Sequence, residues 1–298
     1  RRADPTEKRS GDHDLLQPPR GLVQGSIGHS RRADQKAGAF VLRPILVSIP
    51  LRQALLSARG VDCQNLVHLY ERDCSVQRRF QKVVEVAPCI DLKQTTKDKL
   101  HEYALKIARQ VNYSNAGTVE FLVDKKENIY FIEVNPRIQV EHTITEEITG
   151  IDIVASQIFI AMGYPLSHRT IEISKQEDVK CTGYAIQCRV TTENPAEDFK
   201  PDYGTLVAYR SAGGFGIRLD AGSAYAGAKI SPFFDSMLVK VTAKGRSLKG
   251  VCERLQRALA EFRIRGVNTN IGFLQNLLRN ETFQKGEARV NFINDYPD

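Results

Sequence analysis

The chain of 298 residues is long enough for one large domain or two ordinary ones, and its 42% hydrophobic and 26% charged residues are typical of a globular protein. No apolar run is long enough to span a membrane, and no signal peptide pattern is present. The net charge of +7 is concentrated in residues 1–60, with 11 Lys and Arg against 5 Asp and Glu, so the remaining 31 against 30 give no electrostatic case for nucleic-acid binding.

The cysteines argue for a reducing compartment. Six of them are scattered along the chain without a CxxC pair or a zinc-type spacing, at positions 63, 74, 89, 181, 188 and 252. Such a distribution is typical of buried thiols rather than of disulfides. We therefore expect a cytoplasmic protein, with the mitochondrial matrix as the alternative.

The chain divides by composition into an atypical start and an ordered body. Residues 1–60 hold five of the twelve prolines and lack clear periodicity, which predicts a poorly ordered segment. From Val61 onward, apolar positions at helical spacing predict a helix capped by Thr95 or Thr96. Asp152 is placed to cap a second helix, Ile153–Met162, which is apolar on most faces and is expected to be buried.

The second half of the body alternates between strands and helices without regular βαβ units. The pattern Tyr184–Val190 predicts a strand with apolar residues on one face and Gln187 and Arg189 on the other. Thr205–Arg210 and Ile217–Asp220 read as a hairpin joined by a glycine-containing turn. The mixture predicts an α+β fold with a largely antiparallel sheet.

A second predicted hairpin carries the strongest chemical signal. Gly117–Asp124 and Ile129–Asn135 are rich in β-branched and aromatic residues and flank the polar loop 125–128. Symmetric folding puts Asp124 opposite Ile129 and Glu120 opposite Glu133. Two facing carboxylates repel each other, whereas a divalent cation would bind both of them, because hard cations prefer oxygen ligands.

Further polar residues follow the hairpin. Asn135 lies on the face of Glu133 and adds a third oxygen. If the next residues are extended, Arg137, Gln139 and Glu141 line one face beside the carboxylates. The alternative is an ordinary exposed hairpin stabilised by surface ion pairs, each worth about 0–1 kcal/mol. The convergence of five polar side chains favours a functional site.

Four motifs make the chain recognisable. They are the segments HLYERDCSVQRR, FIEVNPRIQVEHTITEEITG, AIQCRVTTENPAEDF and AEFRIRGVNTNIGFLQNLL. These segments closely resemble the biotin carboxylase domain of pyruvate carboxylase, and their sequences are nearest to those of fungal forms. The resemblance covers about residues 65–298. It implies an ATP-grasp core, the C-terminal part of which is 61–165, followed by the biotin carboxylase C-terminal subdomain in 166–298. It also implies a ligase that uses ATP and Mg²⁺ or Mn²⁺ to activate bicarbonate and carboxylate biotin, as the first half-reaction in converting pyruvate to oxaloacetate.

The resemblance also implies roles for the metal and nucleotide residues. Glu120 and Glu133 would bind magnesium, assisted by Asn135. Gln77 would contact the nucleotide, and Leu122 would border the adenine pocket.

The remaining family roles concern bicarbonate and biotin. Lys82, Arg137, Gln139 and the backbone N–H of Val140 would hold bicarbonate, and Glu141 would be the general base. Arg137 would also face biotin. Arg189 would stabilise the enolate oxygen of biotin as its charge develops. The implied partners are bicarbonate, ATP and a separate biotin carrier domain, with a homo-oligomer in the full enzyme and no nucleic acid or membrane.

Two departures from the family pattern limit these expectations. Phe80 stands where the family has a histidine that contacts the nucleotide, so ATP binding is expected to be weakened or rearranged. Residues 1–60 do not resemble the family's N-terminal subdomain or its glycine-rich lid. Two alternatives therefore stay open: a truncated, non-catalytic fragment of the enzyme, and a different ATP-grasp ligase.

Overall fold

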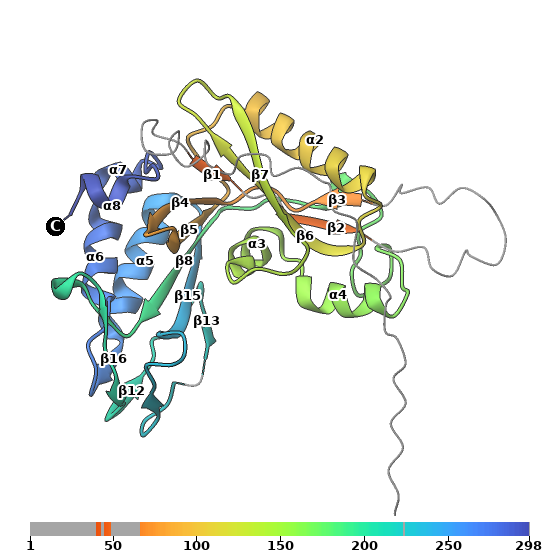
Figure 1. Ribbon diagram of the computed structural model, residues 1–298. Helices are drawn as coiled ribbons and strands as arrows, with labels where there is room; N and C mark the ends of the chain where they lie inside the picture. Colours follow the sequence, from red (N-terminus) through yellow and green to blue (C-terminus); the bar gives the residue numbers. More distant parts are fainter. Residues whose placement is uncertain (1–39, 43–44, 49–65, 223, 298) are drawn as a thin grey trace, which may run out of the picture.

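The computed structural model describes residues 40–42, 45–48, 66–222 and 224–297. One ten-stranded sheet organises this part of the molecule (Figure 1), and its strand pairs are antiparallel. Its strands run in the order β13 (Ile217–Ala221), β15 (Met237–Gly245), β8 (Tyr184–Thr191), β5 (Gln81–Ala87), β4 (Asp73–Arg78), β1 (Phe40–Leu42), β6 (Asn115–Val123), β2 (Ile45–Ser48) and β3 (Leu66–His68), with β7 (Ile129–Asn135) paired to β6. The predicted α+β fold with a largely antiparallel sheet is confirmed.

Seven α-helices and three small two-stranded sheets complete the described part. The helices are α2 (Gln94–Gln110), α3 (His142–Thr149), α4 (Ile153–Ala161), α5 (Leu248–Glu261), α6 (Ile271–Arg279), α7 (Glu281–Gln284) and α8 (Phe292–Asp295). The small sheets pair β9 (Glu193–Asn194) with β10 (Lys200–Pro201), β11 (Gly204–Thr205) with β14 (Lys229–Ile230), and β12 (Ala208–Arg210) with β16 (Arg263–Arg265). Short 3₁₀ turns lie at Gln176–Asp178 and Pro195–Glu197. Among the described helices, none has the length and apolar character needed to cross a bilayer.

The prediction of a poorly ordered start concerns residues that lie largely outside the described part. Within 1–60 the structure describes only β1 and β2. Both strands join the main sheet, where β1 lies between β4 and β6, and β2 lies between β6 and β3.

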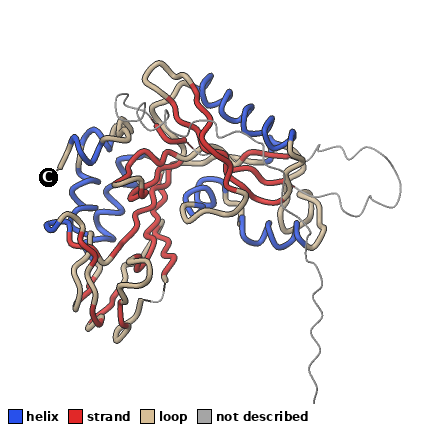
Figure 2. Tube along the Cα trace, viewed as in Figure 1, coloured by secondary structure: helices blue, strands red, loops and turns tan. Residues whose placement is uncertain are grey.

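Helices cover both faces of the β6 region of the sheet (Figure 2). On one face, α2 packs Leu100 and Ala104 against Val119 and Phe121 of β6 in a buried apolar cluster. A separate cluster packs Ile153 of α4 with residues of β3 and β6. The alternation of strand side chains explains this arrangement, since successive residues of β6 face opposite helices.

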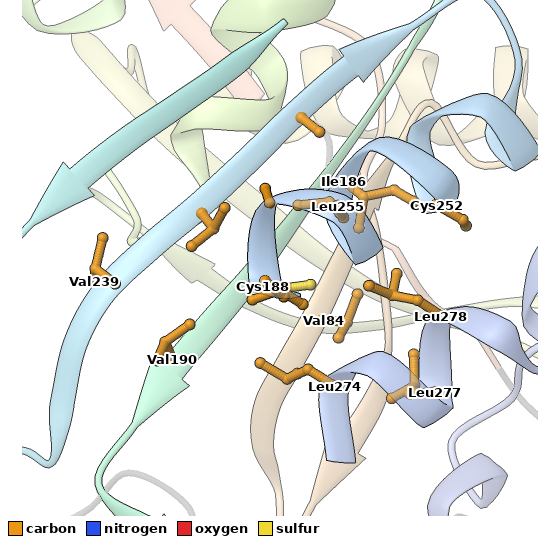
Figure 3. Close-up of a cluster of buried hydrophobic side chains, with 14 of the residues drawn as sticks. Val84, Ile186, Cys188, Val190, Val239, Cys252, Leu255, Leu274, Leu277 and Leu278 are labelled. Carbon is orange, nitrogen blue, oxygen red and sulfur yellow. The ribbon is translucent and has the colours of Figure 1, made fainter. Parts of the chain in front are cut away.

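The other end of the sheet has one apolar face and one polar face. Val84 of β5, Cys188 of β8 and Val241 of β15 pack against Leu255 of α5 and Leu274 of α6 (Figure 3). This is the alternation predicted for Tyr184–Val190, and it is confirmed. The opposite face carries Glu85, Gln187, Arg189, Lys240 and Thr242, which the strand register brings side by side. The α3 side chain Thr143 hydrogen-bonds to both Gln187 and Thr242 on this face.

The two predicted helices form, with differences at their surfaces. Helix α2 begins after Lys93 rather than after a threonine cap. Asp152 caps α4 as predicted, by accepting a hydrogen bond from the backbone N–H of Ala155 at 2.7 Å. The expected burial of α4 is wrong on one side, because Val154 and Ile158 are 45% and 56% exposed.

The predicted hairpin between residues 205 and 220 is also wrong. Strands form there, but β12 pairs with β16 and β13 pairs with β15, so the two do not pair with each other. The glycine-containing segment is therefore a connection between two different sheets. Strand propensity located the strands, but long-range packing selected their partners.

Candidate active site

A cavity of about 580 Å³ opens over the polar face of the sheet. Its walls come from the β4–β5 turn, the end of β7, the segment that leads into α3, the end of β8 and the segment before β15. Nine of the eleven predicted site residues line it: Lys82, Glu120, Glu133, Asn135, Arg137, Gln139, Val140, Glu141 and Arg189. The sequence-based grouping of these residues therefore agrees with their positions in space.

Glu120 and Glu133 are register partners in the β6–β7 hairpin, as predicted. The loop is longer than expected, since Val123 rather than Asp124 lies opposite Ile129. A bulge restores the register: Phe121 pairs with Phe131 while Glu120 pairs with Glu133, so β7 contains one additional residue between them.

Asn135 bridges the two carboxylates. Its Nδ2 donates to Glu120 Oε1 at 2.7 Å and to Glu133 Oε1 at 2.8 Å. Glu120 is 3% exposed, whereas Glu133 lies at the surface of the cavity. The amide group therefore offsets the repulsion between two carboxylates that face each other across the ladder.

Glu141 lies at the start of α3, is 1% exposed and is surrounded by cations. Lys82 Nζ donates to Glu141 Oε1, and Arg189 Nη2 donates to Glu141 Oε2 at 3.2 Å. Arg72 Nη2 lies 3.9 Å from Glu141 Oε1 and is fully buried. A buried carboxylate needs such compensation, because an unpaired charge in the interior costs several kcal/mol.

Gln139 connects the two carboxylate groups of the site. Its side-chain oxygen accepts from Arg72 Nη2 at 2.7 Å, and its Nε2 donates to Glu120 Oε1 at 2.9 Å. The amide is 5% exposed. A continuous set of hydrogen bonds and ion pairs therefore runs from the Glu120 carboxylate through Gln139 and Arg72 to Glu141.

The segment that carries these residues is not extended, in contrast to the prediction. Strand β7 ends at Asn135, and α3 begins at His142. The residues between them bend, so Arg137 is exposed while Gln139 and Glu141 are buried. All three residues still line the cavity.

Arg189 is held by two buried carboxylates. Its Nε donates to Glu85 Oε1 at 2.8 Å, and its Nη2 lies 2.5 Å from Glu85 Oε1 and 3.2 Å from Glu141 Oε2. The Arg189–Glu85 pair is therefore not a surface ion pair, since Glu85 is fully buried. Burial alone would lower the pKa of Arg189, but Glu85 and Glu141 outweigh it and the pKa is raised.

Lys240 supports the backbone of the bicarbonate segment predicted from the resemblance. Its Nζ donates to the carbonyl oxygen of Val140 at 3.3 Å. Burial lowers the pKa of Lys240, partly offset by the charge of Asp220, which lies 3.9 Å away. The contact holds the Val140 carbonyl group, which lies one peptide unit after the Val140 N–H that is the predicted bicarbonate donor.

Comparisons with known proteins identify the family of this chain. The family model for the "Carbamoyl-phosphate synthase L chain, ATP binding domain" matches residues 61–169, and the "Biotin carboxylase C-terminal domain" model matches residues 187–295. Pyruvate carboxylases are 57% identical over 234 residues in Aspergillus terreus, 54% over 239 in Staphylococcus aureus, and 53% over 234 in the mitochondrial form of Homo sapiens. These matches cover 78–80% of this chain. The chain belongs to the pyruvate carboxylase family.

Solved structures of the family have the same fold. Pyruvate carboxylase from Rhizobium etli superimposes with a TM-score of 0.80 at 48% identity, covering 87% of this chain and 25% of that one. The biotin carboxylase subunit of a pyruvate carboxylase gives a TM-score of 0.78 at 38% identity, covering 87% of this chain and 53% of that one. This chain spans about a fifth of the length of the curated relatives, at 19–21%.

Two residues that the family pattern assigns to the nucleotide lie apart from the cavity. Gln77 donates from Nε2 to the Cys74 carbonyl oxygen at 2.7 Å, and Leu122 pairs with Tyr130 in the hairpin. Neither lines the cavity. Their assignment remains a prediction from the family pattern.

Phe80, which replaces the family histidine, does line the cavity. It is 84% exposed at the tip of the β4–β5 hairpin, where Arg79 and Phe80 have φ values of 48° and 65°. Positive φ at both turn positions is usually met by Asn and Gly, because most other residues are strained there. An aromatic ring is thus presented to solvent from a strained turn at the mouth of the cavity.

The sequence interpretation missed three buried members of the site: Arg72, Glu85 and Gln187. Arg72 and Glu85 lie in segments of mixed polar and apolar residues, and Gln187 was placed only on the polar face of its strand. A charged residue within an otherwise apolar strand, as in the KVVEVA segment around Glu85, is the available signal, since ionised side chains are seldom fully buried without a partner.

Proposed function

We propose that this chain carries the bicarbonate- and biotin-facing part of a biotin carboxylase site. In the whole protein the site would catalyse ATP- and bicarbonate-dependent carboxylation of biotin, the first half-reaction of pyruvate carboxylase. The observation that carries the proposal is the buried Glu141 carboxylate, which contacts Lys82 and Arg189 inside a cavity that also holds the facing pair Glu120 and Glu133.

The charge of the site suits a small anion. Three cations, Arg72, Lys82 and Arg189, are arranged around the two carboxylates Glu85 and Glu141. With all five ionised, the cluster has one excess positive charge. A single bicarbonate ion would neutralise it, and Arg137 at the exposed side of the cavity adds a further donor for a planar oxyanion.

The family pattern suggests the roles of the residues, and their positions in the cavity support these roles. Lys82, Arg137, Gln139 and the N–H of Val140 bind and orient bicarbonate. Glu141 accepts the bicarbonate proton as general base, since it is the buried carboxylate that contacts Lys82.

The biotin side of the site belongs to Arg189. It stabilises the negative charge that develops on the ureido oxygen of biotin, because a fixed cation needs no reorganisation as charge appears.

The facing carboxylates fit a magnesium or manganese ion. Glu120 and Glu133 supply hard oxygen ligands from opposite strands. Asn135 presents its Nδ2 to them, so its amide must turn over for Oδ1 to become a third ligand. When bound, the ion would neutralise the phosphate charge of ATP. No group of three or more His, Cys, Asp and Glu side chains within residues 66–222 and 224–297 is placed as a metal cluster, so the proposed ligand set is two carboxylates and an amide.

The finer assignments belong to the same proposal. ATP would be the phosphate donor, a carrier domain would deliver biotin, and the full enzyme would be a homo-oligomer with no nucleic-acid or membrane partner. One structural neighbour, the biotin carboxylase domain of Hydrogenobacter thermophilus 2-oxoglutarate carboxylase, was solved in complex with MgADP, ADP and bicarbonate, which supports the same ligands here. We place the protein in the cytoplasm, with the mitochondrial matrix as the alternative, since one relative is named mitochondrial.

A hybrid enzyme tests the proposed function. In it, residues 66–298 replace the matching segment of the Staphylococcus aureus relative. We expect ADP release that depends on both bicarbonate and biotin, and its loss in Glu141→Gln. The matched control is Glu193→Gln, another cavity-lining carboxylate, which contacts Thr191 and Ser236 rather than the cation cluster. Equal activity in wild type and Glu141→Gln would refute the proposal.

A further inference from the structure

Glu85 is the most deeply buried carboxylate next to the proposed site, and none of the roles above uses it. It has no exposed surface, and it lies on β5 directly opposite Gln187 of β8. Arg189 is two residues further along β8 and therefore points to the same face of the sheet. Burial raises the pKa of Glu85; Arg189 opposes this effect and Glu141 adds to it.

Three groups determine the position of the Glu85 carboxylate. Its Oε1 accepts from Arg189 Nε at 2.8 Å, and its Oε2 accepts from Gln187 Nε2 at 3.0 Å. Gln187 is fully buried, and its Oε1 accepts from Thr143 Oγ1 of α3 at 2.6 Å. Thr143 Oγ1 also lies 2.8 Å from Thr242 Oγ1 of β15. Hydrogen bonds therefore connect the Glu85 carboxylate on β5 with Thr242 on β15, two strands away in the sheet, through Gln187 of β8 and Thr143 of α3.

The geometry at Arg189 separates the two carboxylates that it contacts. Glu85 receives the Nε–H and lies 2.5 Å from Nη2, whereas Glu141 receives only a longer contact from Nη2, at 3.2 Å. Engagement of Nε and Nη2 together defines the plane of the guanidinium, because both nitrogens belong to one rigid edge. Glu141 alone would leave that plane free to turn about a single contact.

Stability alone does not explain the arrangement. Replacing a buried ion pair with apolar residues of similar volume is often neutral or stabilising, so burial of the pair is weak evidence for a stabilising role. The opposite face of the same strands is filled with apolar side chains, so the packing of β5 and β8 against α5 and α6 does not involve the pair. The buried charge of Glu85 can orient the cavity-lining side chain of Arg189, which an apolar pair could not do.

We propose that Glu85 is the positioning residue of the biotin carboxylation site, and that Gln187 and Thr143 hold it in place. Glu85 fixes the guanidinium of Arg189 in the orientation that faces biotin and keeps Arg189 from collapsing onto Glu141. Glu141 then remains available to accept the proton of bicarbonate. The catalytic part of this inference rests on the proposed function, whereas the positioning part does not.

The first experiment tests positioning in the 298-residue chain itself. Hydrogen exchange at the arginine Nε–H groups is followed by NMR in the ¹⁵N-arginine-labelled protein, with Arg189 assigned from the signal lost in Arg189→Lys. We expect slow exchange in wild type and in Glu193→Gln. Exchange at Arg189 should be about tenfold faster in Glu85→Gln, because a neutral acceptor forms a weaker bond than a carboxylate. Glu85→Leu, which removes both acceptors, should give a larger increase. An unchanged exchange rate in Glu85→Gln overturns the proposal, even if Glu85→Leu fails to fold.

The second experiment tests catalysis in the hybrid enzyme. Glu85→Gln should lower kcat for biotin carboxylation about 100-fold while KM for ATP and biotin-independent ATP cleavage stay within about threefold of wild type. Glu85→Asp, which keeps the charge, should recover part of the loss. Losses of equal size in all three, with a lower kcat, a higher KM for ATP and slower biotin-independent ATP cleavage, contradict the positioning role, as does a lack of recovery by Asp. A hybrid whose wild type does not carboxylate biotin contradicts the proposed function instead, and the exchange measurement then decides the role of Glu85 independently.

Discussion

Glu120 and Glu133 face each other across the β6–β7 hairpin, and Asn135 Nδ2 donates to both, at 2.7 Å and 2.8 Å. Gln139 Nε2 gives Glu120 Oε1 a further hydrogen bond at 2.9 Å. The pair therefore combines cross-strand repulsion with donors that offset part of it. Because these effects oppose each other, the change in stability on adding metal tells more about the role of the hairpin than its stability without metal.

Replacing Glu120 with glutamine should uncouple the hairpin from magnesium. Without metal, the loss of repulsion and the weaker hydrogen bonds act in opposite directions, so we expect the free energy of unfolding to change by less than about 1 kcal/mol. Magnesium should stabilise wild type, because a ligand that binds only the folded state adds stability, and should not stabilise the variant. Thermal unfolding of both proteins with and without magnesium measures this. A variant that still responds to magnesium would place the metal site elsewhere.

The ion pair of Arg189 and Glu85 should show strong energetic coupling. Arg189→Met leaves the buried Glu85 charge without its main partner, and we expect a loss of about 3–5 kcal/mol in the free energy of unfolding. Adding Glu85→Gln should recover at least about half of that loss, since the uncompensated charge is removed. Urea unfolding of the two single variants and the double variant provides the cycle. Strict additivity would show that the pair is not coupled.

Phe80 offers a test of the nucleotide side. Its ring is exposed at the mouth of the cavity and cannot donate a hydrogen bond. In the hybrid enzyme, Phe80→His should tighten ATP binding about two- to tenfold, the effect of one added hydrogen bond. Phe80→Leu is the matched control and should not tighten it. An ATP dissociation constant that is the same in all three proteins would make the departure from the family pattern harmless.

His68 should make the stability of the chain depend on pH. Its ring stacks on His101 with centroids 3.9 Å apart, and burial, with a smaller effect of His101, lowers its pKa from 6.5 to about 4. Between these values the unfolded chain binds the proton more readily than the folded one, so stability falls as pH decreases from 6.5 toward 4. His68→Asn should remove up to about 3 kcal/mol of that decrease. Denaturant unfolding at pH 4.5 and 7 measures the difference, and equal pH dependence in both proteins would contradict it.

Local pattern predicted much of this fold. Asp152 and the apolar run after it located α4, and alternation placed Ile186 and Cys188 on the buried face of β8. These features depend on neighbours within a few residues. The exposure of the outer face of α4 could not be predicted in this way, because an apolar composition does not indicate which side of a helix packs against the sheet.

The pairing of Glu120 with Glu133 was predicted correctly, but from a loop length that is one residue too short. A symmetric loop predicted that Glu120 faces Glu133, and it does. The loop is in fact one residue longer, and the bulge in β7 compensates for it. Sequence pattern gives no sign of where a bulge lies, because the additional residue, Ile132, looks like any other strand residue.

The core of the site depends on contacts between distant strands. Arg72 and Gln139 are 67 positions apart, and Glu85 and Arg189 are 104 apart. Neither pair has a local signature. Alternation placed Gln139 and Arg189 on polar faces and the family motifs assigned their roles, but neither signal indicated which residues they contact. Their buried partners became apparent when the strand order of β4, β5 and β8 was known.

The most direct test of the account is transfer of labelled carbon to free biotin. The hybrid enzyme is incubated with ATP, magnesium, biotin and [¹⁴C]bicarbonate, and acid-labile carboxybiotin is counted beside Glu141→Gln and the 298-residue chain alone. We predict label in carboxybiotin for the hybrid and none for the variant or for the chain alone, which spans about a fifth of the length of its curated relatives. A folded hybrid that binds ATP but transfers no label, or transfer that survives Glu141→Gln, would contradict the assignment of this cavity as the carboxylation site.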